Sequence, residues 1–137
     1  MLTLLNKTAE LALYLLEKNG GLVPFCKAST ITGEPLIIMA NVEDGEGPIL
    51  EDERRKCEES AWFELKRRIS ACEIEEFAFC SDSEIKLQNE PASRRFLKIE
   101  FQNGSEESAV YLFPLKFEDG KAEIGRYLMA DVPETLL

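Results

Sequence analysis

Catalytic chemistry in this chain is restricted first by an amino acid that it lacks, because none of its 137 residues is a histidine. Histidine has the side-chain pKa closest to neutral pH, so it commonly acts as a general base and as a metal ligand. Without it, the chain has no Ser-His or Cys-His nucleophile pair and no zinc site that uses imidazole. Any catalysis would therefore depend on carboxylates, thiols or a bound ion.

Four cysteines could carry nucleophilic or metal chemistry, and they are Cys26, Cys57, Cys72 and Cys80. No two of them form a Cys-x-x-Cys pair, so a zinc site would need four thiolates from separate elements to converge. Apolar neighbours such as Phe25 and Phe79 favour small buried thiols instead. We expect four buried cysteines, with no bound metal and no cofactor.

The segment 43–53 combines acidic residues with glycines. Its Gly45-Glu46-Gly47 repeats the first two glycines of a dinucleotide-binding loop, but Leu50 stands in the third position and the surrounding carboxylates repel phosphate. A calcium-binding loop also begins with spaced acids, but this segment lacks the later ligand and glycine. A loose cation site is the alternative to a solvated acidic helix start, and its ligands would be Asp44, Glu46, Glu51 and Asp52.

Paired carboxylates can perform acid–base catalysis without histidine, as in glycosidases. The pairs in this chain, Glu58-Glu59 and Glu75-Glu76, are adjacent in sequence. Adjacent residues point to opposite faces of a strand and diverge by about 100° on a helix, so neither pair forms a converging dyad. Glu75 is expected on the same strand face as Phe77, where burial would raise its pKa, but a strand end that reaches solvent is the simpler interpretation. We assign no catalytic residue, and a carboxylate- or thiol-dependent small enzyme is an alternative interpretation.

The charge of the chain is strongly negative, with 26 Asp and Glu against 16 Lys and Arg and a net charge of −10. Segments 43–59 and 73–90 each carry a net charge of −5 and flank one predicted helix. Such a surface repels nucleic acid and anionic membranes and steers a basic protein toward it. The basic residues at 66–68 and 94–95 are interpreted as a helix end and a strand start. The expected partner-binding residues are Asp44, Glu46, Glu51, Asp52, Glu75 and Glu76.

The size of the chain fits one domain, because 137 residues of which 45% are hydrophobic can bury a substantial core. Its N-terminal apolar run is shorter than a signal peptide needs. No apolar stretch approaches the roughly 20 residues of a membrane-spanning helix. We therefore expect a single soluble domain over residues 1–137, located in the cytoplasm.

The first part of the chain predicts one helix and two strands. Residues 3–18 form an amphipathic pattern that ends at Asn19-Gly20, and glycine readily takes the left-handed conformation found at helix C-termini. Strands over 22–29 and 36–42 should follow as a hairpin. The second strand is a nearly continuous apolar run, which predicts a central strand covered on both faces.

The second part predicts a long helix and three more strands. Residues 49–71 repeat apolar positions every three or four residues, with acids in the first turns and bases in the last. We expect Trp62 and Phe63 of this helix to lie in the core. Asn103-Gly104 is a strong hairpin signal, and the strands after the helix are expected over 74–80, 95–102 and 108–117.

The predicted order is α-β-β-α-β-β-β, whereas 81–94 and 121–137 have no decisive pattern. The simplest arrangement is an α+β fold in which a single antiparallel sheet of about five strands carries helices packed on it. This order resembles that of the roadblock and profilin-like folds, in which such a sheet is sandwiched between helices. The resemblance concerns the fold and implies no activity.

A more local resemblance lies in the first quarter of the chain. It is similar to the opening of small bacterial proteins of unknown function, in which a helix ending at Asn/His-Gly leads into an aromatic-x-Pro-Phe strand and an Asp-Gly-Glu turn. Leu22 replaces the usual aromatic residue and Thr32 replaces the acid. The resemblance implies a small bacterial module with immunity or other interaction roles, and the residues that carry it are Leu13 to Phe25 and Thr32-Gly33-Glu34.

These observations favour a non-catalytic cytoplasmic protein-interaction module with an acidic surface. The local resemblance makes an immunity-like protein that binds a basic partner the leading hypothesis. Two other hypotheses stand beside it. One is the small enzyme described above, and the other is a homodimerisation platform, which the resemblance in fold implies.

Overall fold

The part of the chain that the structure describes folds into two helices and one antiparallel sheet of seven strands. In this computed structural model the described residues are 2–39, 51–104 and 108–130. The predicted α+β class and order of elements are confirmed, and two further short strands follow at the C-terminal end. The elements are α1 (Leu2–Asn19), β1 (Phe25–Thr30), β2 (Pro35–Met39), α2 (Glu51–Ser70), β3 (Ile74–Ile85), β4 (Arg94–Asn103), β5 (Ser108–Glu118), β6 (Lys121–Ile124) and β7 (Leu128–Ala130).

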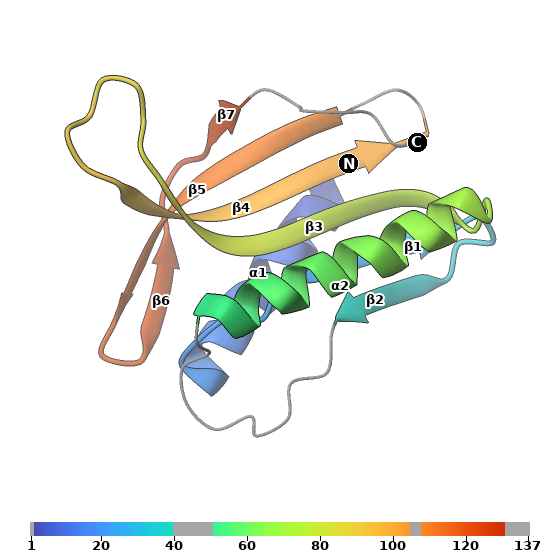
Figure 1. The fold of residues 1–137 in the computed structure, drawn as a ribbon, viewed down its shortest axis with the longest axis horizontal. Coiled ribbons are helices and arrows are strands. Elements are labelled where there is room, and N and C mark those ends of the chain that lie inside the picture. Colours follow the sequence, from blue (N-terminus) through green and yellow to red (C-terminus); the bar gives the residue numbers. More distant parts are fainter. Residues whose placement is uncertain (1, 40–50, 105–107, 131–137) are drawn as a thin grey trace.

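The sheet has the strand order β2-β1-β3-β4-β5-β6, and β7 pairs with β5 (Figure 1). β6 pairs with the last residues of β5, and β7 pairs with residues 110–112 in its first half. All pairs are antiparallel. The segment 81–85, which had no decisive pattern, extends β3, and the described part of the tail forms β6 and β7.

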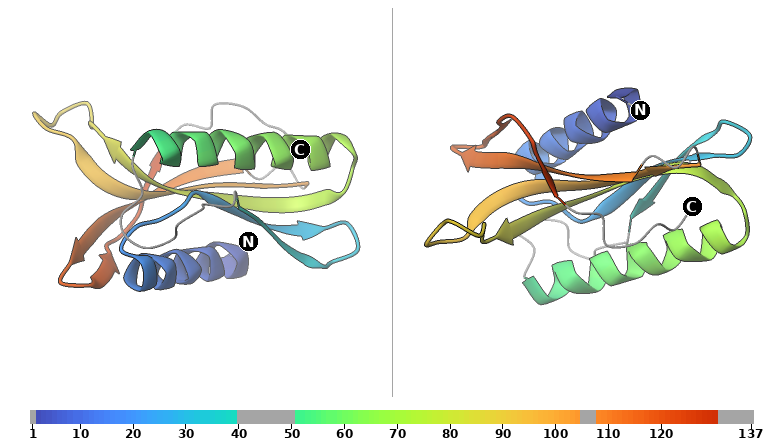
Figure 2. Two further views of the ribbon diagram at one scale, coloured as in Figure 1. Left: turned by 60° about the horizontal axis from the view of Figure 1, so that its bottom comes forward. Right: turned by 90° about the horizontal axis from the view of Figure 1, so that it is seen from above.

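The two helices cover opposite faces of the sheet (Figure 2). α1 packs on β3, β4 and β6, whereas α2 packs on β2, β1 and β3. Because alternate residues of a strand face opposite sides, β3 contributes to both interfaces. Ala78 and Cys80 pack on the α1 side, and Phe77 and Phe79 pack on the α2 side.

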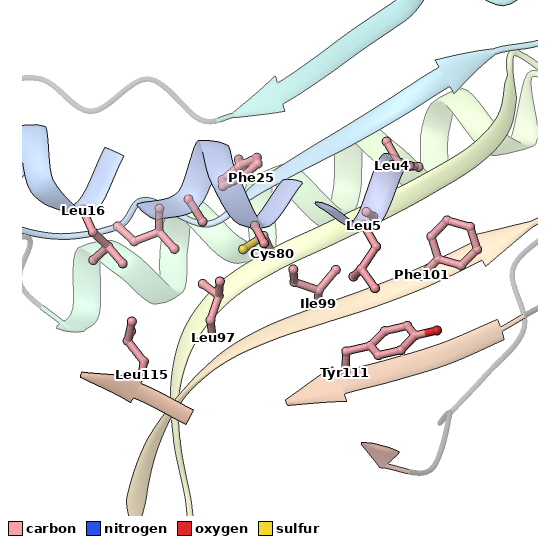
Figure 3. Packing of buried hydrophobic residues seen from close by; sticks show 14 of the residues in the cluster. Leu4, Leu5, Leu16, Phe25, Cys80, Leu97, Ile99, Phe101, Tyr111 and Leu115 are labelled. Atoms are coloured by element: carbon pink, nitrogen blue, oxygen red, sulfur yellow. The ribbon is translucent and has the colours of Figure 1, made fainter. Parts of the chain in front are cut away.

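The larger core lies between α1 and the sheet (Figure 3). The leucines of α1 contact alternating apolar residues of β4, where every second side chain points to this helix. α1 ends as expected, because Gly20 has a φ of 75° and its N–H donates to the carbonyl oxygen of Leu16 at 2.9 Å. The labelled core residues are Leu4, Leu5, Leu16, Phe25, Cys80, Leu97, Ile99, Phe101, Tyr111 and Leu115.

The prediction that Trp62 and Phe63 both lie in the core is only half right. Trp62 is half-buried and stacks on Phe79 with 4.0 Å between the ring centroids. Phe63 is 72% exposed. The two residues are separated by about 100° around the helix, so only one of them can face the sheet.

The expectation of four buried cysteines is wrong for one of them. Cys26, Cys57 and Cys80 are buried, but Cys72 is exposed. It follows the last turn of α2 and has a φ of 59°. The Cys72 N–H donates to the carbonyl oxygen of Ile69, and the Glu73 N–H donates to the carbonyl oxygen of Arg68. These two hydrogen bonds close the helix and hold Cys72 in the left-handed conformation at the surface.

The prediction of a central strand over 36–42 is also wrong. Over the residues described, β2 is at the edge of the sheet and β1 takes the inner position between β2 and β3. Ile38 is buried beneath α2, whereas Ile37 is 50% exposed and Met39 is 38% exposed. α1 lies under β3, β4 and β6, so it does not reach this end of the sheet. Residues 40–42 lie outside the described residues, and the rest of the apolar run, 36–39, has one covered face and one open face.

Candidate functional site

A charged hollow forms where β3 extends beyond its partner β1. The pairing of these two strands stops at Phe25 and Cys80, so the last residues of β3 pair with β4 alone. The first half of α2 lies beside this free edge. The hollow has a volume of about 330 Å³ and is lined by Asp52, Arg54, Arg55 and Glu58 of α2 and by Asp82, Ser83 and Glu84 of β3.

The hollow brings together residues from both acidic segments of the sequence. α2 runs antiparallel to β3, so its first turns meet the last residues of that strand (Figure 1). Four carboxylates and two guanidinium groups line the hollow. Asp52 and Arg55 approach each other at 3.6 Å, and both side chains are largely exposed. The site is therefore an acidic surface that also contains fixed positive charges.

Asp82 is the buried member of this group, with 4% of its side chain exposed. Its two carboxylate oxygens accept hydrogen bonds from Nε of Arg95 at 2.9 and 3.0 Å, and Nη2 of Arg95 donates to Oδ2. These bonds raise the pKa of Arg95, whose guanidinium also lies over the ring of Phe117. The Asp82 carboxylate is buried and already paired with Arg95, so it adds little net charge to the hollow.

A second hollow of about 460 Å³ continues from the first along α2. Arg55 and Glu58 line both hollows. The second also includes the half-buried Trp62 and the exposed Phe63, and its remaining lining residues are Glu59 and Lys66. The two hollows together form one surface, which combines carboxylates at the start of α2 with two aromatic rings near its middle.

The structure separates the predicted partner-binding residues. Asp44 and Glu46 lie outside the described residues, and so does the side chain of Glu51. Asp52 lines the hollow. Glu75 and Glu76 lie near the opposite end of α2, which at about 1.5 Å per residue is roughly 30 Å long. The two acidic segments therefore meet through the end of β3, whereas Glu75 and Glu76, the residues proposed for partner binding, lie at its beginning.

The side chain of Glu75 is exposed, which agrees with the interpretation of a strand end that reaches solvent. The register between β1 and β3 shifts here, so that Ser29 pairs with Glu76 and Thr30 pairs with Ile74. Glu75 is the extra residue of this bulge, and Ile74 takes the place facing α2. Glu76 is half-buried and its Oε1 accepts a hydrogen bond from Oγ of Ser29 at 3.4 Å.

Three of the four thiols are poorly placed for nucleophilic chemistry. Burial raises the pKa of Cys26 and of Cys80 well above the ordinary value, and burial also raises that of Cys57. A thiol must lose its proton to act as a nucleophile, so these groups are unreactive at neutral pH. Within 2–39, 51–104 and 108–130, no three His, Cys, Asp or Glu side chains gather in a group that could hold a metal ion.

No protein-family model, no curated protein and no solved structure matches this chain. Neither described helix is both long and apolar enough to cross a membrane. The function is therefore inferred from the site itself.

Sequence reasoning missed the buried pair of Asp82 and Arg95. A signal for it exists, because a β3–β4 hairpin can place the two residues diagonally across neighbouring strands. In the observed register, Asp82 pairs with Leu97 and Glu84 pairs with Arg95. That register depends on the connection over 86–93, whose turn pattern does not specify it.

Proposed function

We propose that this protein is a non-catalytic, cytoplasmic protein-interaction module of the immunity-like kind, and that it binds a basic partner protein through the charged hollow. The observation that carries the proposal is the convergence of both acidic segments on one hollow, where Asp52, Glu58 and Glu84 supply three carboxylates against two guanidinium groups, while the Asp82 carboxylate is already paired with Arg95. A surface of this kind attracts a basic protein and accelerates its association.

The neighbouring aromatic residues, Trp62 and Phe63, supply binding affinity that charge alone does not provide. Exposed charges contribute mainly to association rate and specificity, whereas buried aromatic side chains contribute most of the affinity at protein interfaces. Trp62 is half-buried against Phe79, so its orientation is already set before binding. Arg55, which lines both hollows, would oppose a partner whose surface carries positive charge at that point. The surface therefore combines attraction, an anchor and a means of discrimination.

A carboxylate-dependent enzyme is supported less well by the same hollow. Asp82 and Glu84 lie two residues apart on β3, with their Cα atoms about 7 Å from each other. An acid–base pair needs two carboxyl groups that can exchange protons. Both oxygens of Asp82 accept hydrogen bonds from Arg95, so this carboxyl group belongs to a structural ion pair. A role in electrostatic recognition fits this arrangement better.

The proposal is tested by titrating the ¹⁵N-labelled protein with an oligolysine peptide and following amide chemical shifts at low and high salt. The largest shifts are expected at residues 52–58 and 82–84, and they should weaken strongly at high salt because exposed charges are screened. Chemical-shift changes that are spread evenly over all acidic parts of the surface would contradict the proposal, and so would an affinity that does not depend on salt concentration.

A charge-matched pair of variants separates the hollow from the overall charge. The first combines Asp52→Asn, Glu58→Gln and Glu84→Gln, which remove three carboxylates from the hollow. The control combines Glu10→Gln, Glu118→Gln and Glu123→Gln, three exposed positions that do not line it. We expect at least a tenfold loss of peptide affinity in the first and a change of less than threefold in the control. Equal losses would show that only net charge matters.

A further inference from the structure

We propose that two copies of this chain form a symmetric dimer by antiparallel pairing of their β2 strands, with Ile37 of each copy at the two-fold axis. This inference concerns the β2 edge of the described sheet, which does not line the charged hollow, and it does not rest on the proposed function. It follows from three properties of β2: its backbone, its side chains and its charge.

The backbone of β2 presents hydrogen-bonding groups at the edge of the described sheet. The Thr30 N–H donates to the carbonyl oxygen of Glu34 at 2.9 Å, which sets the alternation of the hairpin. Leu36 and Ile38 therefore direct their backbone groups toward β1, and Ile37 and Met39 direct theirs outward. Among residues 2–39, 51–104 and 108–130, no strand pairs with this outer edge.

Pairing of β2 with itself uses every outward N–H group of the strand. When Ile37 lies at the two-fold axis, each Ile37 N–H donates to the carbonyl oxygen of the other Ile37. Each Met39 N–H then donates to the carbonyl oxygen of Pro35 in the other copy. Proline has no N–H, so its position opposite Met39 leaves no donor unpaired. All five residues of β2 pair, and every outward N–H of the strand is satisfied.

The side chains of β2 favour burial on both faces of such a dimer. Ile37 and Met39 are the exposed apolar residues of the strand, and Pro35 lies on the same face. Around the axis, these three residues from each copy would form a continuous apolar stripe. On the other face, Leu36 and Ile38 already pack against α2. Large exposed apolar side chains on an edge strand are a common site of strand pairing between chains.

The charge distribution favours a second copy at this edge. Each chain has a net charge of −10, so two copies repel each other over most of their surfaces. β2 contains no charged residue, and Lys27 is the residue of β1 that pairs with Ile37. The seam therefore brings no carboxylate of β2 against another. Salt should leave the dimer unchanged or strengthen it, whereas it should weaken the binding of a basic peptide in the hollow.

The dimer is tested first by sedimentation velocity over a range of protein concentrations and at two salt concentrations. We expect a concentration-dependent dimer that persists at high salt. Ile37→Lys places two positive charges at the axis and should shift the dissociation constant at least thirtyfold. Ile31→Lys is the matched control, because Ile31 is 60% exposed but lies in the turn outside the strand. It should change the constant less than threefold.

The register is tested by cysteine crosslinking in a Cys72→Gly background, which removes the exposed native thiol. In the proposed pairing, the Cα atoms of the two Ile37 residues are about 5.5 Å apart, a separation that a disulfide spans. Those of the two Met39 residues are about 14 Å apart, which is too far. Under mild oxidation, Ile37→Cys should give a covalent dimer and Met39→Cys should not.

Several outcomes would overturn the inference. A monomer at all concentrations would mean that the edge is covered by another segment of the chain or serves a different protein. A dimer that tolerates Ile37→Lys would place the interface elsewhere, and efficient crosslinking through Met39→Cys would refute the register. None of these outcomes bears on peptide binding to the hollow, which the shifts at 52–58 and 82–84 report separately.

Discussion

Arg95 and Asp82 lie on neighbouring strands of the β3–β4 hairpin, where the Arg95 guanidinium donates hydrogen bonds to both oxygens of the buried Asp82 carboxylate. The pair fixes the wall of the hollow on one side and contacts Phe117 on the other. The pair thereby connects the charged surface to the end of the sheet where β3 no longer pairs with β1.

Replacing Asp82 by Asn should destabilise the fold while keeping the size of the side chain. The variant leaves Arg95 without its anion in a partly buried position, so the free energy of unfolding should fall by about 2 kcal/mol. Urea denaturation measures the change. Arg94→Gln is the control, because Arg94 pairs with Glu90 at the surface and its loss should cost less than about 0.5 kcal/mol. An Asp82→Asn variant of unchanged stability would show that the pair contributes nothing.

The stability of the protein should depend on pH through Glu64. Hydrogen bonds from Arg67 and Arg68 lower the pKa of this carboxyl from 4.5 to about 2. A lowered carboxyl pKa stabilises the folded state above the unfolded value, and this contribution is lost as the pH falls from 4.5 toward 2. The thermal midpoint of Glu64→Gln should therefore lie below that of the wild type at pH 6 and approach it near pH 2.

Exposed Glu59 on the same helix supplies the control for this experiment. Thermal midpoints of Glu59→Gln should run parallel to those of the wild type over the same pH range. If the difference between Glu64→Gln and the wild type stays constant down to pH 2, the ion pair does not account for the pH dependence.

The stacked rings of Trp62 and Phe79 should report the docking of α2 on the sheet. Trp62 is the single tryptophan of the chain, so its fluorescence is specific. Phe79→Leu removes the stacked ring and should lower the free energy of unfolding by about 1–2 kcal/mol while shifting the emission to longer wavelength. Phe63→Leu, at an exposed position, should change stability by less than about 0.5 kcal/mol. Similar effects of the two substitutions would argue against the stacking.

Cys72→Gly should make the protein more stable. Cys72 adopts a left-handed conformation at the end of α2, which costs a residue with a side chain about 1 kcal/mol relative to glycine. The free energy of unfolding should rise by that amount in urea denaturation. Ser70→Gly, two residues earlier inside the helix, should lower it by a similar amount, because glycine weakens a helix. Stabilisation by both variants would rule out the conformational explanation.

Much of the fold follows from local patterns in the sequence. The helix over Leu2–Asn19 begins and ends close to the predicted residues, because its apolar spacing and the Gly20 stop are local signals. The second helix and the hairpin after Asn103 are recovered for the same reason. The position of β2 could not be recovered, because a continuous apolar run is equally compatible with a central strand and with an edge strand of which one face is open.

The site was predicted less well than the fold. The sequence correctly indicated two acidic segments around one helix, and Asp52 lies in the hollow as part of the first. The contribution of the second segment depends on the antiparallel course of α2 and β3, which brings Glu84 to the hollow and leaves Glu75 at the far end. The bulge at Glu75 also reverses which side chains face α2, and such a shift of register has no clear signal in composition or spacing.

The sequence by itself determined the α+β order of elements, the absence of imidazole chemistry and the strongly negative charge, because these depend on residue types and on neighbours within a few positions. Tertiary structure alone decided which charges meet and which apolar residues stay exposed. It placed Asp82 against Arg95 and left Ile37 at the sheet edge. The physical reason is that pairing register and helix coverage arise from contacts between segments far apart in the chain.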